Sequence, residues 1–377
     1  MNDSPAPVDT APQTTALEER LLTLIAENGP ISVGDFMHDA LCHAQHGYYT
    51  TQDPFGQDGD FTTAPEISQI FGELIGAWLI DAWQTMGSPS LFNLVELGPG
   101  RGTLMADILR VGQVMPPFIN AARIYMLETS GRLRVKQQRV LDPWHDRITW
   151  IDQLEDIPAA PTLLVANEFF DCLPIRQFMR TADVGETPWR ERLVGHTPDG
   201  KSLCFVLSEE KYPSPPGAPS SAKPEDIFEY CAAGEAVVLD LAERLKAHKG
   251  RMLIIDYGHG RPGFGDTFQA VKRHDYWHPL ASPGLADVTA HVDFSALARA
   301  GRAADIRVDG PVRQGDFLNR LGLQQRLEVL CNGIEDDNKR ADIQSGAGRL
   351  SDPDAMGTLF KVLSLSSPGF DEPPGFS

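Results

Sequence analysis

Several features that mark whole classes of protein are missing from this chain of 377 residues. It has five cysteines and no Cys-x-x-Cys pair, which argues against a disulfide framework and indicates reduced thiols. No apolar run reaches the length of about 18 residues that a membrane span requires. With 33 Lys and Arg against 52 Asp and Glu, the net charge is −19. That charge disfavours binding to nucleic acid and fits a cationic partner.

The N-terminal residues 1–16 contain much Pro, Thr and Ala and no Lys or Arg. They predict a disordered tail rather than a secretion signal or a transit peptide. Together with the reduced cysteines, this favours the cytoplasm of a bacterial cell. The histidines between residues 259 and 291 match no zinc pattern and no cysteine accompanies them, so we expect no metal site.

The most informative segment is a short apolar strand, 91–97, that runs into a glycine-rich turn and then a helix. Gly98, Gly100 and Gly102 let the backbone approach a ligand closely, and a helix N-terminus favours anionic groups. The spacing Glu-x-Gly-x-Gly-x-Gly differs from the dinucleotide-binding pattern. Glu96, two residues before the first glycine, suits the ammonium end of a cationic sulfonium ligand. We therefore expect this turn to bind S-adenosylmethionine.

Polar residues also follow the next two strands of a parallel α/β series. The second strand, 123–127, ends at Glu128, which is well placed to hold two ribose hydroxyls. The third, 148–151, is followed by Asp152 and Gln153, which we expect near the adenine unless they form a solvated loop. The carboxyl ends of parallel strands meet at one edge of a sheet, so these side chains predict one ligand site.

The fourth and fifth strands supply the candidate catalytic residues. Asn167 closes the fourth strand and is expected at the cofactor, and Glu168 and Asp171 follow it. Asp256 follows the fifth strand. Carboxylates can hold a guanidinium group through paired hydrogen bonds and direct its charge, so we expect Glu168, Asp171 or Asp256 to act in catalysis. The alternative for each is a helix cap or a salt bridge.

A long helix is expected from Thr63 to about Met86, ahead of the glycine turn. Thr63 is placed as its N-cap and Glu66 completes a capping box. This helix should pack over the edge of the cofactor, with Asp60 in contact with the ligand. Capping alone could also explain these residues.

Seven short motifs extend the pattern in collinear order over most of the chain. They are GDFTTAPE at 59–66, ELGPGRG at 96–102, NEFFD at 167–171, GDTFQAV at 265–271, AHVDF at 290–294, QGDFL at 314–318 and MGTLFKV at 356–362. Together they resemble the MidA family, whose mitochondrial members are complex I assembly methyltransferases. The resemblance covers residues 17–365.

This resemblance implies a Rossmann-type methyltransferase fold that uses S-adenosylmethionine. It also implies symmetric dimethylation of an arginine on a protein partner, such as a quinone-module subunit of complex I. No second glutamate closely follows Glu168, so the two-glutamate loop of better-known arginine methyltransferases is not reproduced. The alternatives are a small-molecule methyltransferase and a non-catalytic assembly factor that binds S-adenosylmethionine. The sequence leaves the oligomeric state open.

The expected fold is an α/β methyltransferase sheet with a helical N-terminal extension and a β-rich insertion. A helix from about 227 to 248 should return the chain to the sheet, and an acidic loop should follow a helix near 318–330. The expected division is a disordered tail at 1–16, a helical extension at 17–90, the first part of the core at 91–175, an insertion and return helix at 176–250, the second part of the core with a loop-rich lid at 251–365, and a tail at 366–377.

Overall fold

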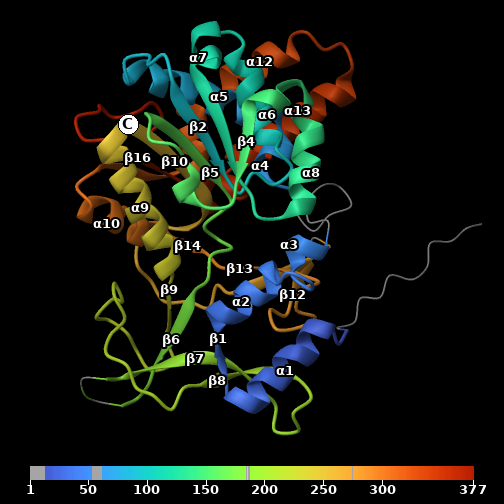
Figure 1. Cartoon of the computed structure of the whole chain (residues 1–377), viewed down its shortest axis with the longest axis vertical. Coiled ribbons are helices and arrows are strands. Elements are labelled where there is room, and N and C mark those ends of the chain that lie inside the picture. Colours follow the sequence, from blue (N-terminus) through green and yellow to red (C-terminus); the bar gives the residue numbers. More distant parts are fainter. Residues whose placement is uncertain (1–12, 53–61, 184, 186, 274) are drawn as a thin grey trace, which may run out of the picture.

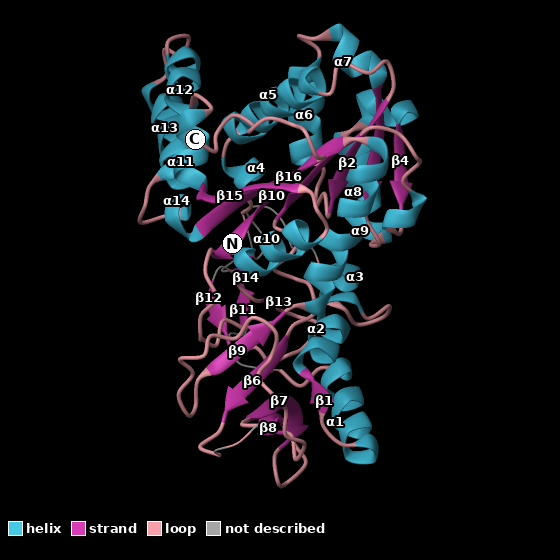
Figure 2. Ribbon diagram, turned by 90° about the vertical axis from the view of Figure 1, so that its left-hand side faces the viewer, coloured by secondary structure: helices cyan, strands magenta, loops and turns pink. Residues whose placement is uncertain are grey.

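The computed structural model describes residues 13–52, 62–183, 185, 187–273 and 275–377, and the expected site residue Asp60 lies outside them. The chain forms two lobes joined at a narrower waist (Figure 1). One lobe holds a large sheet flanked by helices (Figure 2). The other holds smaller antiparallel sheets and the first helices of the chain. We call them the core lobe and the distal lobe.

The core lobe is built on one mixed sheet with the strand order β15-β16-β10-β5-β2-β3-β4. Strands β4, β3, β2, β5 and β10 run parallel, and β16 is antiparallel to both of its neighbours. A short strand, β14, pairs with the end of β10. The bounds are β2 Phe92–Leu97, β3 Ala122–Leu127, β4 Ile148–Ile151, β5 Thr162–Asn167, β10 Gly250–His259, β14 Val292–Asp293, β15 Arg307–Arg313 and β16 Phe360–Ser366.

The order of the strands reverses between β2 and β5. The chain moves from β2 outward to β3 and β4, then crosses back to β5 on the other side of β2. The loops after β2 and β5 therefore leave the sheet in opposite directions and open a crevice at their carboxyl ends. The glycine turn follows β2 and Glu168 follows β5 at this point. The parallel series predicted from the sequence is confirmed.

Alternate residues of each strand face two separate hydrophobic layers. Leu94 of β2 packs with helices on one face, and Val95 packs with α9 and α10 on the other. The buried strands are apolar on both sides because helices cover both faces of the sheet. Helices on the first face are α4 Ala64–Ile67, α5 Gln69–Thr85, α6 Thr103–Gly112, α7 Pro116–Ala121, α11 Gln314–Arg320, α12 Leu323–Cys331, α13 Asp337–Ser351 and α14 Met356–Leu359. Those on the second are α9 Ala232–His248 and α10 Phe294–Ala303, and α8 Gly131–Val140 lies beside the glycine turn.

The distal lobe combines the β-rich insertion with the N-terminal helices. Its larger sheet has the order β1-β7-β6-β9, with β8 paired to β7, and its smaller sheet has the order β12-β11-β13. Helices α1 and α2 pack on these sheets through a shared apolar cluster. The bounds are α1 Ala16–Asn28, β1 Ile31–Ser32, α2 Val33–Cys42, α3 Tyr48–Thr51, β6 Arg176–Arg180, β7 Trp189–His196, β8 Leu203–Leu207, β9 Ile227–Tyr230, β11 Gln269–Lys272, β12 Asp275–Trp277 and β13 Asp287–Thr289.

The expected N-terminal extension, 17–90, is thus shared between the lobes. Helices α1 and α2 belong to the distal lobe, while α4 and α5 pack on the core sheet. The single helix expected from Thr63 is interrupted at Ser68, which has an extended backbone and caps α5 through the N–H of Ile70. Thr63 stands at the N-cap of α4, but its side chain makes no cap hydrogen bond.

Three other local predictions need correction. Residues 227–230 form β9, an added strand of the insertion sheet, and the return helix begins only at α9, after Cys231. The segment expected as loop-rich contains the β11–β13 sheet. The segment expected as an acidic loop contains α13, because Asp336 accepts hydrogen bonds from the N–H groups of Asn338 and Lys339 and caps that helix.

The C-terminal residues pack on the core lobe instead of extending away from it. The indole of Trp78 donates to the carbonyl of Pro374 (3.2 Å), and Phe376 packs against Phe317. Arg251 donates to the carbonyl of Asp371 (2.7 Å). Within the described part of the chain, no helix is long and apolar enough to cross a bilayer.

Glu73 of α5 ties three helices together. Its carboxylate, 7% exposed, accepts hydrogen bonds from Arg110 of α6 (2.8 Å) and Arg326 of α12 (2.7 and 3.1 Å). Burial alone would raise the pKa of Glu73, but the hydrogen bonds and charges of Arg326 and Arg110 outweigh it and lower that pKa. A carboxylate whose folded pKa is lowered stabilises the fold above its unfolded pKa, and this stabilisation is lost as the pH falls through the folded value.

We expect Glu73→Gln to lower the free energy of unfolding by about 1–3 kcal/mol at pH 7, because two arginines lose a buried charged partner. The difference from the wild type should shrink below about pH 4, where the carboxyl is protonated in both states. Urea unfolding followed by circular dichroism at several pH values measures both effects. Glu328→Gln, at an exposed position of α12, is the matched control and should shift stability by less than about 0.5 kcal/mol. A pH-independent deficit in Glu73→Gln would contradict the ion-pair interpretation.

Candidate active site

The glycine turn is the floor of the candidate site. Gly98, Gly100 and Gly102 all have positive φ values, 62°, 53° and 84°, in the region that favours glycine. A Cβ atom at Gly98 would lie 2.9 Å from the ring of Phe169. Gly98 and Gly100 line cavities, whereas Gly102 faces Leu141 and Gln137 and caps α6. Gly102 therefore shapes the turn and does not face the ligand space.

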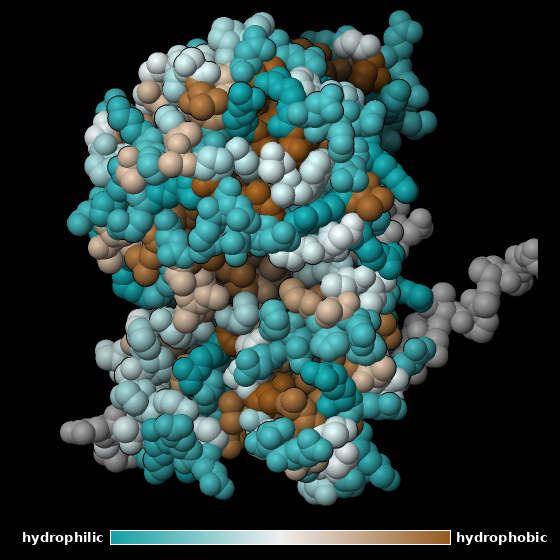
Figure 3. All heavy atoms as spheres, in the orientation of Figure 1, coloured by the Kyte–Doolittle hydropathy of each residue, from teal (hydrophilic) through white to brown (hydrophobic). Residues whose placement is uncertain are grey.

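Two adjoining cavities lie over this turn, at the junction of the lobes. Their volumes are about 630 and 1820 Å³, and they share Tyr49, Gly98, Gly100 and Glu168 as walls. The larger cavity extends along the end of β3 to Glu128, and the smaller one reaches Glu96 and Asp171. On the face seen in Figure 3, hydrophobic and hydrophilic side chains mix at the waist between the lobes. The shared walls make the cavities one elongated site.

Glu96 lies at the end of β2 with only 3% of its surface exposed. Burial raises its pKa well above the usual range, although an N–H of Met105 in α6 acts in the opposite direction. Its Oε2 atom is buried and has no hydrogen-bond partner among the described residues. A buried carboxylate oxygen without a partner is costly, so this position calls for a cationic donor.

Glu128 follows β3 and faces the larger cavity. Its Oε1 atom accepts a hydrogen bond from the N–H of Ser130 (2.8 Å), and its Oε2 atom accepts one from Gln137 (3.0 Å). The same amide of Gln137 donates to the carbonyl of Gly100 (2.8 Å). Gln137, fully buried on α8, thus fixes the acid relative to the turn. Sequence reasoning missed it, because nothing in a helix sequence marks one inward glutamine.

Asp152 and Gln153, expected near the adenine, point away from the site. Asp152 is 73% exposed and pairs with Arg134 (2.7 Å). Gln153 donates to Asp156 (3.3 Å) on the surface. Neither residue lines either cavity. The structure therefore places these two residues in a solvated loop after the third strand, which is the alternative to the expected contact with adenine.

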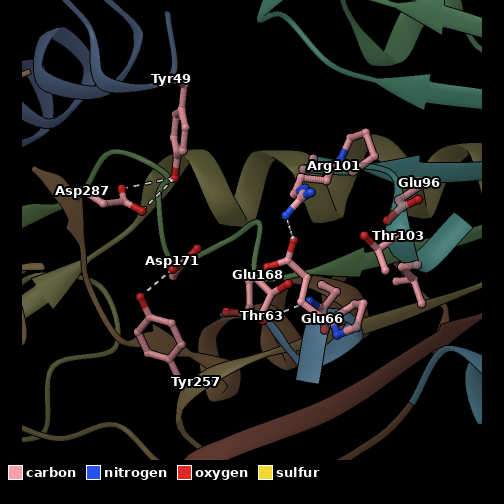
Figure 4. A pocket seen from close by; sticks show the side chains of 16 residues that line it. Tyr49, Thr63, Glu66, Glu96, Arg101, Thr103, Glu168, Asp171, Tyr257 and Asp287 are labelled. Atoms are coloured by element: carbon pink, nitrogen blue, oxygen red, sulfur yellow. Dashed lines mark hydrogen bonds and ion pairs between the residues drawn. The ribbon is translucent and has the colours of Figure 1, made fainter. Parts of the chain in front are cut away.

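Glu168 directly follows β5 and lines both cavities. Figure 4 shows its side chain in the smaller one. Its φ of 51° is unusual for a residue with a side chain, and such strain gathers at functional positions. Its Oε1 atom accepts hydrogen bonds from the N–H of Ala64 (3.3 Å) and the amide of Asn167 (3.1 Å). Burial and the nearby charge of Asp171 raise the pKa of Glu168 to about 8. Asn167 also faces the smaller cavity, and its Oδ1 atom has no partner among the described residues.

Asp171 and Tyr257 form a pair on the other side of the smaller cavity. The phenol of Tyr257 donates to Asp171 (2.5 Å), and both residues line the cavity. Burial raises the pKa of Asp171 to about 6, although the hydrogen bond from Tyr257 acts against this. The structure thus brings Glu168 and Asp171 to one cavity, as the sequence predicted.

Asp256 holds the loop that carries these two acids and does not face either cavity. It is fully buried. Its Oδ2 atom accepts from the N–H groups of Phe170 (3.0 Å) and Asp171 (3.2 Å). Its Oδ1 atom accepts from the N–H of Tyr257 (2.9 Å). The structure therefore places Asp256, a candidate catalytic residue in the sequence, behind the loop as a positioning residue and not at either cavity.

Four further charged or polar residues complete the smaller cavity, and sequence reasoning did not assign them to it (Figure 4). Tyr49 of α3 donates to Asp287 of β13 (3.2 and 3.3 Å) across the mouth. Glu66 of α4 lies 3.5 Å from Arg101 of the turn. Two of them, Glu66 and Arg101, lie in the motifs given above, but the convergence of all four depends on the fold. Among the described residues, no cluster of His, Cys, Asp and Glu has the geometry to hold a metal.

Comparison with known proteins agrees with this geometry. Residues 74–312 match the sequence profile of a family described as S-adenosyl-L-methionine-dependent methyltransferase. A Drosophila melanogaster relative named protein arginine methyltransferase NDUFAF7 homolog, mitochondrial, is 38% identical over 93% of this chain and 84% of its own length. The human protein arginine methyltransferase NDUFAF7, mitochondrial, is 34% identical over 93% of this chain and 83% of its own length. The chain belongs to the MidA family of S-adenosylmethionine-dependent methyltransferases.

A solved structure supports the fold of this MidA-family chain. A Burkholderia thailandensis protein with bound S-adenosyl-homocysteine is 26% identical, with a TM-score of 0.80 over 96% of this chain and 94% of that one. The site residues of the present chain fit the methyl donor. The unpartnered oxygen of Glu96 suits its ammonium group, and Glu128 at the larger cavity suits its ribose hydroxyls.

We expect Glu128→Ala to weaken binding of S-adenosylmethionine by about 10- to 100-fold, because the ribose loses its hydrogen bonds to a carboxylate. Asp152, like Glu128, directly follows a strand, but its side chain points to solvent. The affinity of Asp152→Ala for S-adenosylmethionine should therefore stay within about twofold of the wild type. Calorimetric titration of both variants measures the difference. Equal losses in the two variants would show that Asp152 moves into the site and that the assignment of the adenosine end is wrong.

Proposed function

We propose that this chain methylates the side chain of an arginine on a protein partner. The observation that carries the proposal is the charge of the smaller cavity. Among the described residues, its lining has five carboxylates and one Arg or Lys, which is Arg101. Such a cavity favours a cation and disfavours anionic or neutral acceptors. The carboxylates are Glu66, Glu96, Glu168, Asp171 and Asp287.

The relatives support the choice of arginine among cationic side chains, since those named above are protein arginine methyltransferases. A guanidinium group is planar and offers paired N–H donors that match carboxylates, and it stays protonated near neutral pH. Glu168 and Asp171 face one cavity from one loop and could receive such a pair. In this proposal, Glu168 and Asp171 take the role that two glutamates of one hairpin loop have in better-known arginine methyltransferases.

Glu168 is proposed to hold the guanidinium and to take its proton. S-adenosylmethionine, when bound, supplies a methyl group activated by its sulfonium sulfur. The accepting nitrogen must give up one proton as it gains the methyl carbon, so the product keeps a single positive charge. Ala64 and Asn167 both donate to Oε1 of Glu168, and Oε2 has no hydrogen-bond partner among the described residues. Oε2 is therefore the atom proposed to receive the proton.

The pKa of Glu168, raised to about 8 by burial and Asp171, predicts how activity depends on pH. A base must be deprotonated, so kcat/KM should fall about tenfold per pH unit below about 8 and level off above it. The substrate guanidinium does not titrate in this range. Rates of methyl transfer from labelled S-adenosylmethionine between pH 6 and about 9 measure the profile. Glu168→Gln should lower kcat by about 10²–10⁴-fold while binding of the methyl donor persists. A flat profile in the wild type would contradict the role of Glu168.

The proposed partner is a protein such as a quinone-module subunit of complex I, with symmetric dimethylation as the product. We expect the purified enzyme to place label from S-adenosylmethionine on one arginine of that recombinant subunit, located by mass spectrometry. An Arg→Lys substitution at that position should abolish the label. Label that appears only in a small-molecule fraction would favour a small-molecule acceptor. Binding of both donor and subunit without any label would favour a non-catalytic assembly factor.

A cytoplasmic location in a bacterial cell belongs to the same proposal. The five cysteines are all free in the structure, which fits a reducing compartment. Four of them are partly buried and Cys42 is exposed.

A further inference from the structure

The smaller cavity poses an electrostatic problem for the methyl donor itself. The amino-acid end of S-adenosylmethionine carries an ammonium group and a carboxylate. The ammonium suits Glu96, as argued above. The donor carboxylate, however, would enter a space lined by five carboxylates. Buried like charges repel strongly at low effective dielectric, so the donor carboxylate needs a cation of its own.

Of the described residues that line this cavity, Arg101 is the single Arg or Lys. It follows Gly100 in the glycine turn, which forms the floor of the site. Its side chain points into the cavity (Figure 4). A guanidinium can bind a carboxylate through two parallel hydrogen bonds. Arg101 therefore has both the charge and the position that the donor carboxylate requires.

The present partner of Arg101 holds it only loosely. Its Nη1 atom lies 3.5 Å from Oε1 of Glu66, and the side chain is 42% exposed. This is, within the described part of the chain, its one ion pair. The second oxygen of Glu66 is buried and has no hydrogen-bond partner among the described residues. Burial raises the pKa of Glu66, although the charge of Arg101 acts in the opposite direction. A long, weakly held ion pair costs little to exchange for a better one.

The start of α6 favours the same placement. Thr103 and Leu104, the first two residues of this ten-residue helix, line the smaller cavity. The N-terminal end of a helix carries partial positive charge and attracts anions. Arg101 and the helix end lie on the same side of the turn as the amino-acid end of the donor, since Glu96 faces the same cavity.

We propose that Arg101 binds the carboxylate of S-adenosylmethionine, exchanging Glu66 for it, while Glu96 receives the ammonium. Glu96 and Arg101 together then recognise both charges of the amino-acid group. This assignment concerns the methyl donor and does not depend on which acceptor the enzyme uses.

The test compares S-adenosylmethionine with its decarboxylated form, which keeps the ammonium and the sulfonium and lacks only the carboxylate. Both are titrated calorimetrically into the full chain. Arg101→Met should weaken binding of S-adenosylmethionine by about 10- to 100-fold and leave the decarboxylated form within about twofold of the wild type. Arg101→Lys keeps the charge without the planar fork, so its loss should be intermediate.

Two further variants provide controls. Glu96→Gln should weaken both ligands, because both carry the ammonium. Arg123→Met removes an exposed arginine at the far end of β3 and should change neither affinity. Retained binding of the decarboxylated form by Arg101→Met also shows that this variant is folded.

Two outcomes would overturn the assignment. Equal weakening of both ligands by Arg101→Met would mean that the arginine supports the turn structurally. Unchanged affinity of Arg101→Met for both ligands, with altered turnover of a protein substrate, would mean that Arg101 instead keeps Glu66 from pairing with the incoming acceptor.

Discussion

Buried negative charge with few cations to balance it is the constraint on which this site depends. In the described part of the chain, five carboxylates line one cavity beside a single arginine, and burial raises the pKa of Glu66, Glu96, Glu168 and Asp171. Such an arrangement is unfavourable in isolation, and the surrounding fold must hold it in place. A cationic methyl donor and a cationic acceptor would each relieve part of that cost. Affinity for both would then arise from the same electrostatic source.

The rigidity of the β5 loop is what keeps these acids together. Asp256, at the adjacent strand β10, accepts three backbone N–H groups and fixes the loop that carries Glu168 and Asp171. The N–H of Glu168 continues the strand pairing by donating to Ile255 (2.9 Å), and its left-handed backbone then turns the side chain into the cavity. An acid that faces neither cavity thus positions two acids that line the smaller one.

The distal lobe contributes to the wall of the site opposite the core sheet, where Tyr49 lines both cavities. The carbonyl of Tyr49 accepts a hydrogen bond from Ser130 (2.7 Å), whose N–H binds Glu128 at the adenosine end. The phenol of Tyr49 binds Asp287 at the mouth of the acidic cavity. Tyr49 of the short helix α3 therefore contacts residues of both cavities, so the N-terminal segment helps to build the site.

The sequence by itself determined the parallel strands, the glycine turn and the acids that end the strands, because strand periodicity, turn chemistry and capping are local. The sequence also predicts Glu96, Glu128 and Glu168 as site residues, because parallel strands bring their carboxyl ends to one edge of the sheet. Only the tertiary structure decided which acids face the ligand. Asp152 and Asp256 look like the others in sequence, yet one turns to solvent and the other to backbone N–H groups. Likewise, Tyr49 and Asp287 meet across 238 residues of chain. Such contacts follow from packing of the two lobes, which no local pattern encodes.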